Sequence, residues 1–299
     1  MLGQEDISKK PFPFLKWAGG KRTLVPEILP LIPMHFNNYY EPFVGGGAVF
    51  FALSEYLKNA YLSDNNIELA ITYQVIKNNP RPLIDMLREH QENHNKEYYS
   101  KMRDGFEPRT DVEYAARLIY LNKTCYNGLF RVNKKGKFNV PMGKYENPTI
   151  LDTGNLLACH RALKNASIRY DDFSGIKPKR GDFVYFDPPY HPTQEALPSF
   201  TGYTKQDFSE KDQLRLQEFI VELTKCGVFV MLSNSNTPFI QKLYPSKKFL
   251  SKTVHAPRLV NCKPESRGNV EELIITNYPI LEQCNREPVQ TLLEISSKS

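Results

Sequence analysis

The sequence predicts an α/β fold with an open, largely parallel sheet, helices on both faces and one long insertion. A strand candidate at residues 39–44 runs into Gly45-Gly46-Gly47 and then into a helical pattern. A second apolar run, 182–186, ends in Asp187-Pro188-Pro189-Tyr190. The alternation of strands and helices is interrupted between about residues 75 and 160. Ligands bind at the carboxyl ends of strands in such sheets, so both turns are candidates for one site.

The composition is that of a basic globular protein. The chain has 299 residues, is 40% hydrophobic and carries a net charge of +6 at pH 7, which suits a polyanionic partner without requiring one. Five scattered cysteines without a C-x-x-C pair predict reduced thiols rather than a disulfide framework or a zinc site. No apolar run approaches the roughly 18 residues of a membrane span, and the N-terminus does not resemble a signal peptide. We expect a soluble cytoplasmic protein without a metal.

The N-terminal part predicts a loose arm over residues 1–11, followed by a basic loop at 14–22. That loop reads Phe-Leu-Lys-Trp-Ala-Gly-Gly-Lys-Arg and holds the only tryptophan of the chain, Trp17. A glycine pair lets the backbone approach a ligand closely. Taken alone, the stretch is equally compatible with an ordinary basic loop.

The glycine turn at 45–47 lies between a strand and a helix expected over residues 48–58, a layout that places a ligand at a helix N-terminus. A second short strand, 61–63, ends in Asp64. The distance in sequence from Gly45 to Asp64 is that at which a Rossmann-type unit places its ribose-binding carboxylate. The turn and the acid together indicate a nucleoside cofactor, although Gly-Gly-Gly is not the full dinucleotide motif.

Residues 66–122 predict helices, with Asp111 as a candidate cap and Ala115, Leu118, Ile119 and Asn122 on one buried face. The segment His90-Gln91-Glu92-Asn93-His94 resembles a zinc-protease motif but has Gln where that motif needs Glu. It is better explained as a solvated helix face.

Residues 126–145 predict a basic hairpin. Val132 and the run 138–140 flank the turn Lys134-Lys135-Gly136-Lys137, and cations alternate with aromatic residues throughout. A two-stranded basic ribbon can hold phosphates and enter a major groove. A solvated hairpin with a charged tip is the alternative.

The second half of the chain resumes the strand and helix pattern. Strands are expected at 167–170, which precedes Asp172 and Phe173, and at 228–232. Ser209 with Asp212 predicts the start of a helix whose buried stripe is Leu216, Phe219, Ile220 and Leu223. Segments 249–254 and 269–277 predict an antiparallel edge, and 283–299 a loose tail. The expected division is a catalytic unit of 1–74 and 161–282 around an insertion of 75–160.

The Asp187 turn, residues 187–190, has the groups needed to activate a weakly nucleophilic amine. Two prolines fix φ and remove two backbone donors. The Asp187 carboxylate and the Pro188 carbonyl could each accept one N–H of an exocyclic amine, while a base stacks on Tyr190. Attack on a sulfonium methyl then needs positioning and electrostatics but no covalent enzyme intermediate. A base inside a duplex would have to be flipped out first. No cysteine follows a proline, which disfavours methylation at a ring carbon.

Five motifs, in this order along the chain, make it resemble the Dam-type DNA adenine methyltransferases, including the DpnM-like enzymes. They are the segments 14–22, Glu-Pro-Phe-Val-Gly-Gly-Gly (41–47), Tyr-Asn-Gly-Leu-Phe-Arg (126–131), Phe-Asn-Val-Pro-Met-Gly-Lys-Tyr (138–145) and Tyr-Phe-Asp-Pro-Pro-Tyr (185–190). The resemblance covers residues 14 to about 278. It implies a seven-stranded Rossmann-like methyltransferase sheet with an inserted, mainly helical recognition domain. It also implies methyl transfer from S-adenosylmethionine to the 6-amino group of adenine in duplex DNA, usually within GATC.

The resemblance also implies roles for individual residues. Asp187, Pro188, Pro189 and Tyr190 would be catalytic. The residues expected to hold S-adenosylmethionine are Trp17, Ala18, Gly19, Lys21, Phe43, Gly45, Gly46, Gly47, Asp64, Asn65, Asp172, Phe173 and Asp187. Lys16 and Arg131 would read guanines, and Tyr126 would wedge into the duplex with Asn127 facing the orphaned thymine. The remaining DNA contacts would be Leu129, Asn133, Pro141, Lys144, Tyr145, Arg258 and Arg267.

Some alternatives and departures remain at this point. The loop 256–268 has two prolines, a cysteine and a glutamate where relatives are richer in Ser, Thr and Gly. Methylation of the cytosine amino group uses the same chemistry, and a non-catalytic DNA-binding protein could hold S-adenosylmethionine as a structural ligand. The expected partner is double-stranded DNA, bound by a monomer associated with the nucleoid. A cognate restriction endonuclease is a further possible partner.

Overall fold

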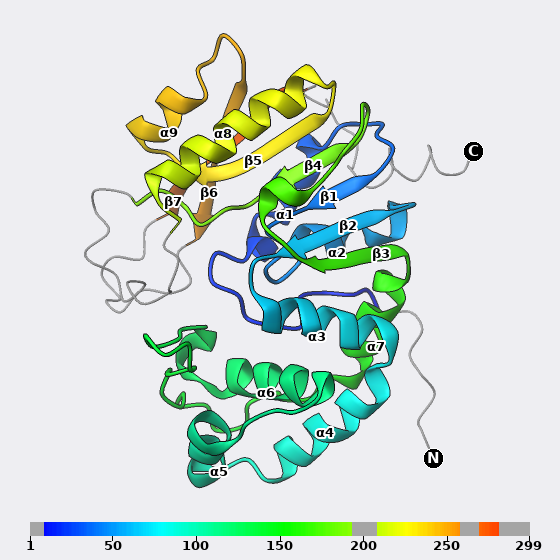
Figure 1. The fold of residues 1–299 in the computed structure, drawn as a ribbon, viewed down its shortest axis with the longest axis vertical. Coiled ribbons are helices and arrows are strands. Elements are labelled where there is room, and N and C mark those ends of the chain that lie inside the picture. The colour runs from blue at the N-terminus through cyan, green and yellow to red at the C-terminus, as the bar shows by residue number, and fades with distance from the viewer. Residues whose placement is uncertain (1–8, 193–207, 258–268, 281–299) are drawn as a thin grey trace.

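The computed structural model describes residues 9–192, 208–257 and 269–280. These residues form a seven-stranded sheet in the order β3-β2-β1-β4-β5-β7-β6 (Figure 1). The strands β1 to β5 are parallel to one another, whereas β7 is antiparallel to both of its neighbours, β5 and β6. The predicted seven-stranded α/β fold is therefore confirmed. The strands are β1 (Tyr39–Glu41), β2 (Ala60–Asp64), β3 (Ala166–Tyr170), β4 (Phe183–Phe186), β5 (Phe229–Ser235), β6 (Leu250–Pro257) and β7 (Asn269–Thr276).

Alternation along the strands sends successive side chains to opposite faces of the sheet, and both faces are covered. On one face Val184 and Phe186 of β4 belong to a core with Leu216 and Ile220 of α8. On the other face Phe183 and Tyr185 join a larger core. That larger core is continuous with buried residues of the insertion, as expected for helices on both sides of a parallel sheet. The helices around the sheet are α1 (Val25–Ile28), α2 (Ala48–Leu53), α3 (Ile67–Asn78), α7 (Thr153–Ala162), α8 (Glu210–Lys225) and α9 (Pro238–Leu243).

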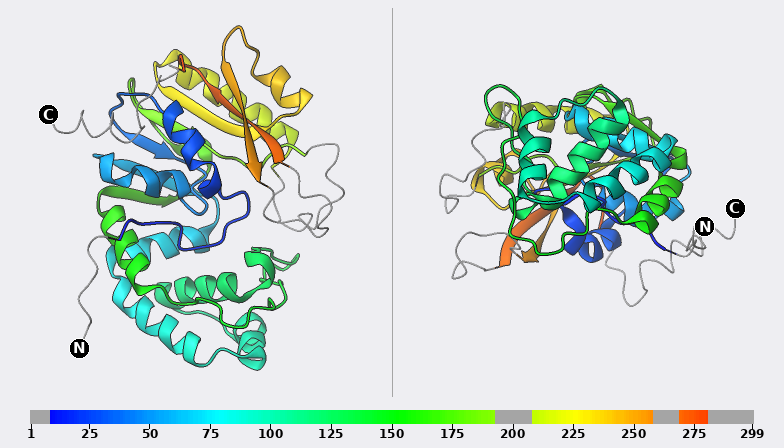
Figure 2. Two further views of the ribbon diagram at one scale, coloured as in Figure 1. Left: turned by 180° about the vertical axis from the view of Figure 1, so that it is seen from behind. Right: turned by 90° about the horizontal axis from the view of Figure 1, so that it is seen from below.

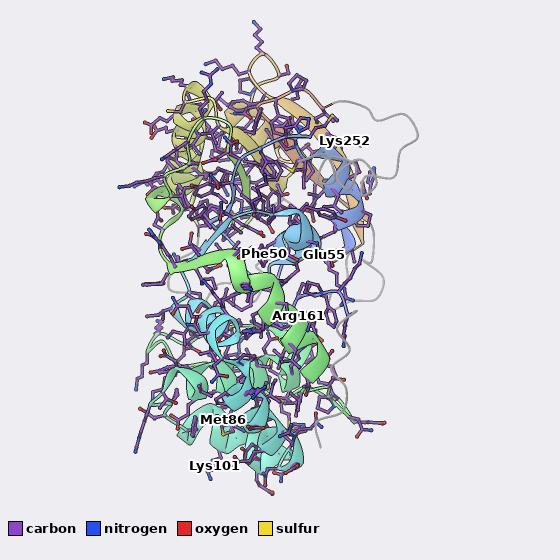
Figure 3. All side chains as sticks on the ribbon, turned by 90° about the vertical axis from the view of Figure 1, so that its right-hand side faces the viewer. Phe50, Glu55, Met86, Lys101, Arg161 and Lys252 are labelled. Carbon is purple, nitrogen blue, oxygen red and sulfur yellow. The ribbon has the colours of Figure 1, made fainter. Side chains whose placement is uncertain are left out.

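The insertion lies beyond the β3 edge of the sheet, at the bottom of Figure 1. Its helices are α4 (Pro80–Glu92), α5 (Lys96–Ser100) and α6 (Asp111–Thr124). The N-terminal segment, dark blue in Figure 2, crosses between the sheet and these helices. In the side view of Figure 3, Met86 and Lys101 mark the insertion and Lys252 the opposite end of the molecule.

Several local expectations are corrected. The first helix after the glycine turn ends at Leu53 rather than at 58 and continues as a 3₁₀ turn. The cap of α6 is Thr110, not Asp111, and it forms a reciprocal capping box with Glu113. The expected two-stranded ribbon is reduced to isolated bridges, Cys125 with Met142 and Val132 with Phe138. Pro141 lacks the backbone donor that a continuous ladder would need there.

Candidate active site

The Asp187 turn follows β4, whose four residues are all buried. One carboxylate oxygen of Asp187 lies 2.9 Å from the Lys21 ammonium nitrogen, and the Lys21 side chain is only 5% exposed. The same nitrogen lies 4.6 Å from the centre of the Tyr190 ring. The basic loop at 14–22 is thus part of the site, because its lysine lies against both the acid and the aromatic ring of the turn.

Strand β7 contributes an acid that the sequence analysis missed. The Tyr190 hydroxyl donates to the Glu272 carboxylate at 2.6 Å, and that oxygen lies 4.0 Å from the Lys21 nitrogen. Sequence reasoning assigned the region to an edge strand and gave no role to its charged residues. The available signal was an acidic pair, Glu271-Glu272, before an otherwise apolar run.

Burial controls the charge state of the carboxyl groups near β1 and β4. Burial raises the pKa of Asp187 to about 6, while the Lys21 ammonium opposes the rise. Glu41, at the end of β1, is fully buried, and burial raises its pKa to about 8 although the Tyr39 hydroxyl donates to it at 2.7 Å. Burial thus favours the neutral form of both carboxyl groups, and the Lys21 ammonium counteracts this at Asp187.

The glycine turn at 45–47 lies at the end of β1, next to β4. Gly45 and Gly47 have φ of +47° and +69°, a region in which L side chains are strained. A Cβ on Gly45 would lie 2.7 Å from an indole carbon of Trp17. The Tyr73 hydroxyl donates to the Gly45 carbonyl at 3.0 Å. The two glycine-containing loops are therefore packed directly on each other.

Asp64 lies beside this glycine turn, as its spacing predicts. Its two carboxylate oxygens accept the backbone N–H groups of Gly45 and Asn66, each at 3.0 Å. Burial raises the pKa of Asp64 to about 6 against the effect of these hydrogen bonds. Each oxygen has a further lone pair, so the carboxylate can accept additional hydrogen bonds from hydroxyl groups of a ligand.

Asp172 and Phe173 follow β3 and have a partner that the sequence analysis missed. The Arg215 guanidinium of α8 makes a bidentate pair with Asp172 at 2.7 and 3.0 Å and lies 4.2 Å from the Phe173 ring centre. Phe43 stacks on Phe173 with ring centres 5.5 Å apart. Burial alone would raise the pKa of Asp172, but hydrogen bonds from Arg215 and Ser174 lower it to about 2.

Asn122 of α6 joins the basic loop to the hairpin segment, residues 126–145. Its side-chain oxygen accepts the Lys16 N–H at 2.8 Å, and its nitrogen donates to the carbonyls of Lys16 at 2.7 Å and Gly128 at 2.9 Å. Asn122 is fully buried. A Cβ on Gly128 would lie 2.5 Å from the Lys16 Cβ. The Trp17 and Phe130 rings stack with centres 5.5 Å apart, which extends the same junction.

The hairpin segment presents polar groups at the surface. Tyr126 is 42% exposed, and Asn127 has a φ of 54°. The Arg131 guanidinium donates to the side chain of Asn139 at 2.8 Å and to its carbonyl at 3.1 Å. The Asn133 side chain accepts the N–H groups of Lys135 and Lys137 and shapes the tip.

The remaining predicted DNA contacts of the hairpin segment are Leu129, Pro141, Lys144 and Tyr145. The Lys16 ammonium lies 4.1 Å from the centre of the Tyr145 ring. Pro141 and Lys144 are exposed, whereas Leu129 is half-buried. The Pro141 carbonyl accepts the Tyr126 N–H at 2.9 Å, which draws the two ends of the segment together.

Comparison with known proteins assigns the family. Residues 17–256 match the model of the D12 class N6 adenine-specific DNA methyltransferases. The chain belongs to this family. It is 45% identical to the type II methyltransferase M1.LlaDCHI of Lactococcus lactis, over 89% of this chain and 95% of that protein. It is also 45% identical to the type II methyltransferase M.MjaIII of Methanocaldococcus jannaschii, over 89% and 99%. The DNA adenine methylase of Haemophilus influenzae is 33% identical, over 92% and 98%.

In the described part of this DNA methyltransferase, most of the predicted site residues lie at the carboxyl ends of the parallel strands or in the adjoining hairpin segment. Arg258 and Arg267 lie outside the described residues, as does the tail at 283–299. Within the described ranges, no cluster of His, Cys, Asp and Glu side chains could hold a metal ion. No helix in those ranges is long and apolar enough to cross a membrane.

One pocket of the methyltransferase lies away from the Asp187 turn. It is lined by Phe50, Glu55 and Arg161, which Figure 3 labels, and by Ala60 and Ala166 at the amino ends of β2 and β3. None of the predicted site residues lines it. The candidate active site is therefore defined by its polar side chains and strand ends, not by this pocket.

Proposed function

We propose that the enzyme transfers a methyl group from S-adenosylmethionine to the 6-amino group of an adenine flipped out of duplex DNA. The observation that carries this proposal is the placement of Asp187 and the glycine turn at the carboxyl ends of adjacent strands, β4 and β1. The strand order changes direction between these two strands, and ligands bind at such a switch point. A methyl donor and an amine acceptor would meet there.

The residues at this edge fit S-adenosylmethionine. Asp64 has acceptor capacity for ribose hydroxyls, and the left-handed Gly45 and Gly47 let the backbone approach the ligand. Asp172 would accept a hydrogen bond from the amino group of the cofactor's adenine. The adenine ring would contact Phe43 or Phe173. When bound, the cofactor supplies a methyl group on a positively charged sulfur. The other residues proposed to line its site are Trp17, Ala18, Gly19, Lys21, Gly46 and Asn65.

The Asp187 turn would hold and activate the target amine. The Asp187 carboxylate and the Pro188 carbonyl accept one N–H each, which aims the nitrogen lone pair at the methyl carbon. The base stacks against Tyr190, whose hydroxyl is fixed by Glu272. Lys21 keeps Asp187 ionised and therefore able to accept. Formation of the N–C bond would be matched by cleavage of the methyl–sulfur bond, leaving S-adenosylhomocysteine, and Asp187 would receive the extra proton from the methylated nitrogen. Catalysis then rests on position and charge.

DNA recognition is assigned to residues 75–160, and catalysis to 1–74 and 161–282. Arg131 and Lys16 would read guanines, since an arginine fork matches guanine O6 and N7. Tyr126 would occupy the space left by the flipped adenine, with Asn127 facing its former partner. Leu129 and Pro141 would contact base edges, Lys144 would contact a DNA phosphate, and Asn133 and Tyr145 would also contact the DNA. We propose GATC as the target and a monomer as the active form, working on DNA of the nucleoid.

Expression in a host that lacks DNA methylation tests this function. Sequencing of genomic DNA for modified bases should show N6-methyladenine at GATC, and the Asp187→Ala variant should leave the DNA unmodified. Methyladenine confined to a different sequence would refute the GATC assignment while retaining the chemistry. Full modification by the Asp187→Ala variant would refute the proposed mechanism.

A further inference from the structure

We propose that Gln213 of α8 and Asn234 of β5 are positioning residues, which fix the backbone of the Asp187 turn so that the Pro188 carbonyl faces the target amine. This inference rests on the proposed function, because it takes Asp187 and Pro188 as the two acceptors. Neither Gln213 nor Asn234 belongs to the motifs of the sequence analysis. They contact the turn from α8 and β5, and both side chains are fully buried.

Four hydrogen bonds form a chain from α8 through β5 to the turn. The Gln213 side-chain nitrogen donates to the Pro189 carbonyl at 2.9 Å. The Asn234 side-chain nitrogen donates to the Gln213 side-chain oxygen at 3.1 Å, and the Asn234 oxygen accepts the His191 N–H at 3.2 Å. The Ser235 hydroxyl donates to the His191 carbonyl at 2.6 Å. The peptide groups on both sides of Tyr190 are therefore held.

The backbone dictates the orientation of both amides. The Pro189 carbonyl can only accept, so the nitrogen of Gln213 must face it, and the Gln213 oxygen is left for the Asn234 nitrogen. The Asn234 oxygen then faces two donors, the N–H groups of His191 and Ser235. Reversal of either amide would place two donors or two acceptors in contact at both of its ends. In a buried site such mismatches cost free energy, so this series of hydrogen bonds has one stable arrangement.

This arrangement determines where the Pro188 carbonyl points. The ring of Pro189 fixes its φ, but its ψ stays free. The bond from Gln213 to the Pro189 carbonyl fixes that ψ. With both angles of Pro189 set, the peptide between Pro188 and Pro189, which carries the Pro188 carbonyl, is fixed relative to the peptide between Pro189 and Tyr190, whose carbonyl Gln213 holds. Among the described residues no donor reaches the Pro188 carbonyl, so it is available for the amine, whereas the Pro189 carbonyl is already occupied.

The chain offers a matched control at the other end of β5. The Asn277 side chain donates to the Thr224 hydroxyl at 2.9 Å and to the Val228 carbonyl at 2.8 Å, and it accepts the Val230 N–H at 2.8 Å. It ties strand and helix ends together in the same way but makes no contact with the Asp187 turn. Asn277→Leu and Gln213→Met each remove one amide while keeping an apolar side chain of similar size.

The first experiment compares these two variants. Both should lower the melting temperature, but only Gln213→Met should lower kcat, by about 10- to 100-fold, because a small misplacement of a reacting group has effects of this size. The rate is expressed per folded enzyme, counted by binding of S-adenosylhomocysteine, with DNA and S-adenosylmethionine saturating. The KM values for both should stay close to wild type. A kcat loss no larger than that of Asn277→Leu would overturn the inference.

A second variant, Gln213→Glu, tests the donor itself. A protonated glutamic acid can donate to the Pro189 carbonyl and accept from Asn234, whereas the carboxylate can only accept. Its kcat relative to wild type should therefore rise towards wild type as the pH falls. The new carboxylate would raise the pKa of nearby Asp187, which by itself would lower this ratio as the pH falls, so a rise in the ratio reports the donor at position 213. A ratio independent of pH would contradict a role as donor. Failure of the proposed function is distinguishable, because it would appear as retained activity of Asp187→Ala.

Discussion

Residues 187–190 are held by side chains from distant parts of the chain, whereas the outer part of the hairpin segment, residues 131–139, is held mainly by its own residues. Lys21 and Glu272 fix the acid and the ring of the Asp187 turn, and Gln213 fixes its backbone. In the hairpin segment Arg131 pairs with Asn139, and Asn133 shapes its own tip. The difference fits two tasks. A reacting amine needs acceptors fixed before it arrives, whereas base reading needs surface groups that can exchange partners.

The largest expected effect is that of the Asp187→Ala substitution, which tests the fixed side of this contrast. Loss of an acceptor that acts on the reacting nitrogen should lower kcat by about 10³-fold or more. Binding of S-adenosylmethionine should change little, because Asp64 and the glycine turn are untouched. Tritiated-methyl transfer to plasmid DNA measures the first quantity, and calorimetry measures the second. Retained turnover would mean that the turn is not the site of chemistry.

Arg131→Ala should affect sequence choice more than total rate. We expect discrimination at one guanine to fall by about 1–3 kcal/mol, with other positions unchanged. Comparing kcat/KM on GATC and on singly substituted sites measures this loss. Lys135→Ala, at the exposed tip of the same segment, is the matched control and should leave discrimination unchanged. An equal loss on every sequence would make Arg131 a phosphate contact.

The pH dependence of kcat/KM tests the Lys21–Asp187 ion pair. The charged carboxylate is the acceptor, and burial places the pKa of Asp187 at about 6, so activity should fall as the pH falls through about 6. Lys21→Met removes the ammonium that opposes the effect of burial, so it should raise this pKa and move the acid limb to higher pH. Arg22→Gln changes a neighbouring exposed cation and should not move it. If the acid limb of the kcat/KM profile stays at the same pH in Lys21→Met, the Lys21–Asp187 ion pair does not control the ionisation of Asp187.

The smallest expected effect is that of Lys144→Ala. This side chain is exposed, and a phosphate contact contributes charge without sequence information. Affinity should weaken about equally for cognate and unrelated DNA, and the slope of log K against log salt should fall by about 1. Fluorescence anisotropy over a salt series gives both values. Selective weakening on GATC would move Lys144 to the group of base-reading residues.

Local patterns in the sequence predict the strand ends but not what packs on them. The order of strand, glycine turn and acid places Asp64 beside Gly45, because both belong to one short unit. Ser209 is predicted as the cap of α8 for the same reason, and it forms the expected capping box. These features depend on neighbours in sequence, so single-chain patterns suffice.

The partners that complete the site come from other elements. Arg215 and Gln213 lie on a helix whose pattern predicts only its buried stripe, and Glu272 lies in a strand predicted as an edge. Which turn such side chains meet depends on the order of strands in the sheet, in which β7 pairs with β5. Asn122 is predicted on a buried face, but two of its three backbone partners belong to Lys16, 106 residues away, and the third is the carbonyl of Gly128 in the following turn. No periodicity could identify them.

The junction at Asn122 would allow the outer part of the hairpin segment to be exchanged. All three of its hydrogen bonds end on backbone atoms of Lys16 and Gly128, so none depends on the side chains from 129 to 142. A chimaera that takes residues 129–142 from a relative with another target sequence, but keeps Phe130 on Trp17 and the buried Phe138 and Val140, should therefore keep its attachment to the catalytic half. New specificity could arise by such transplants without rebuilding the joint.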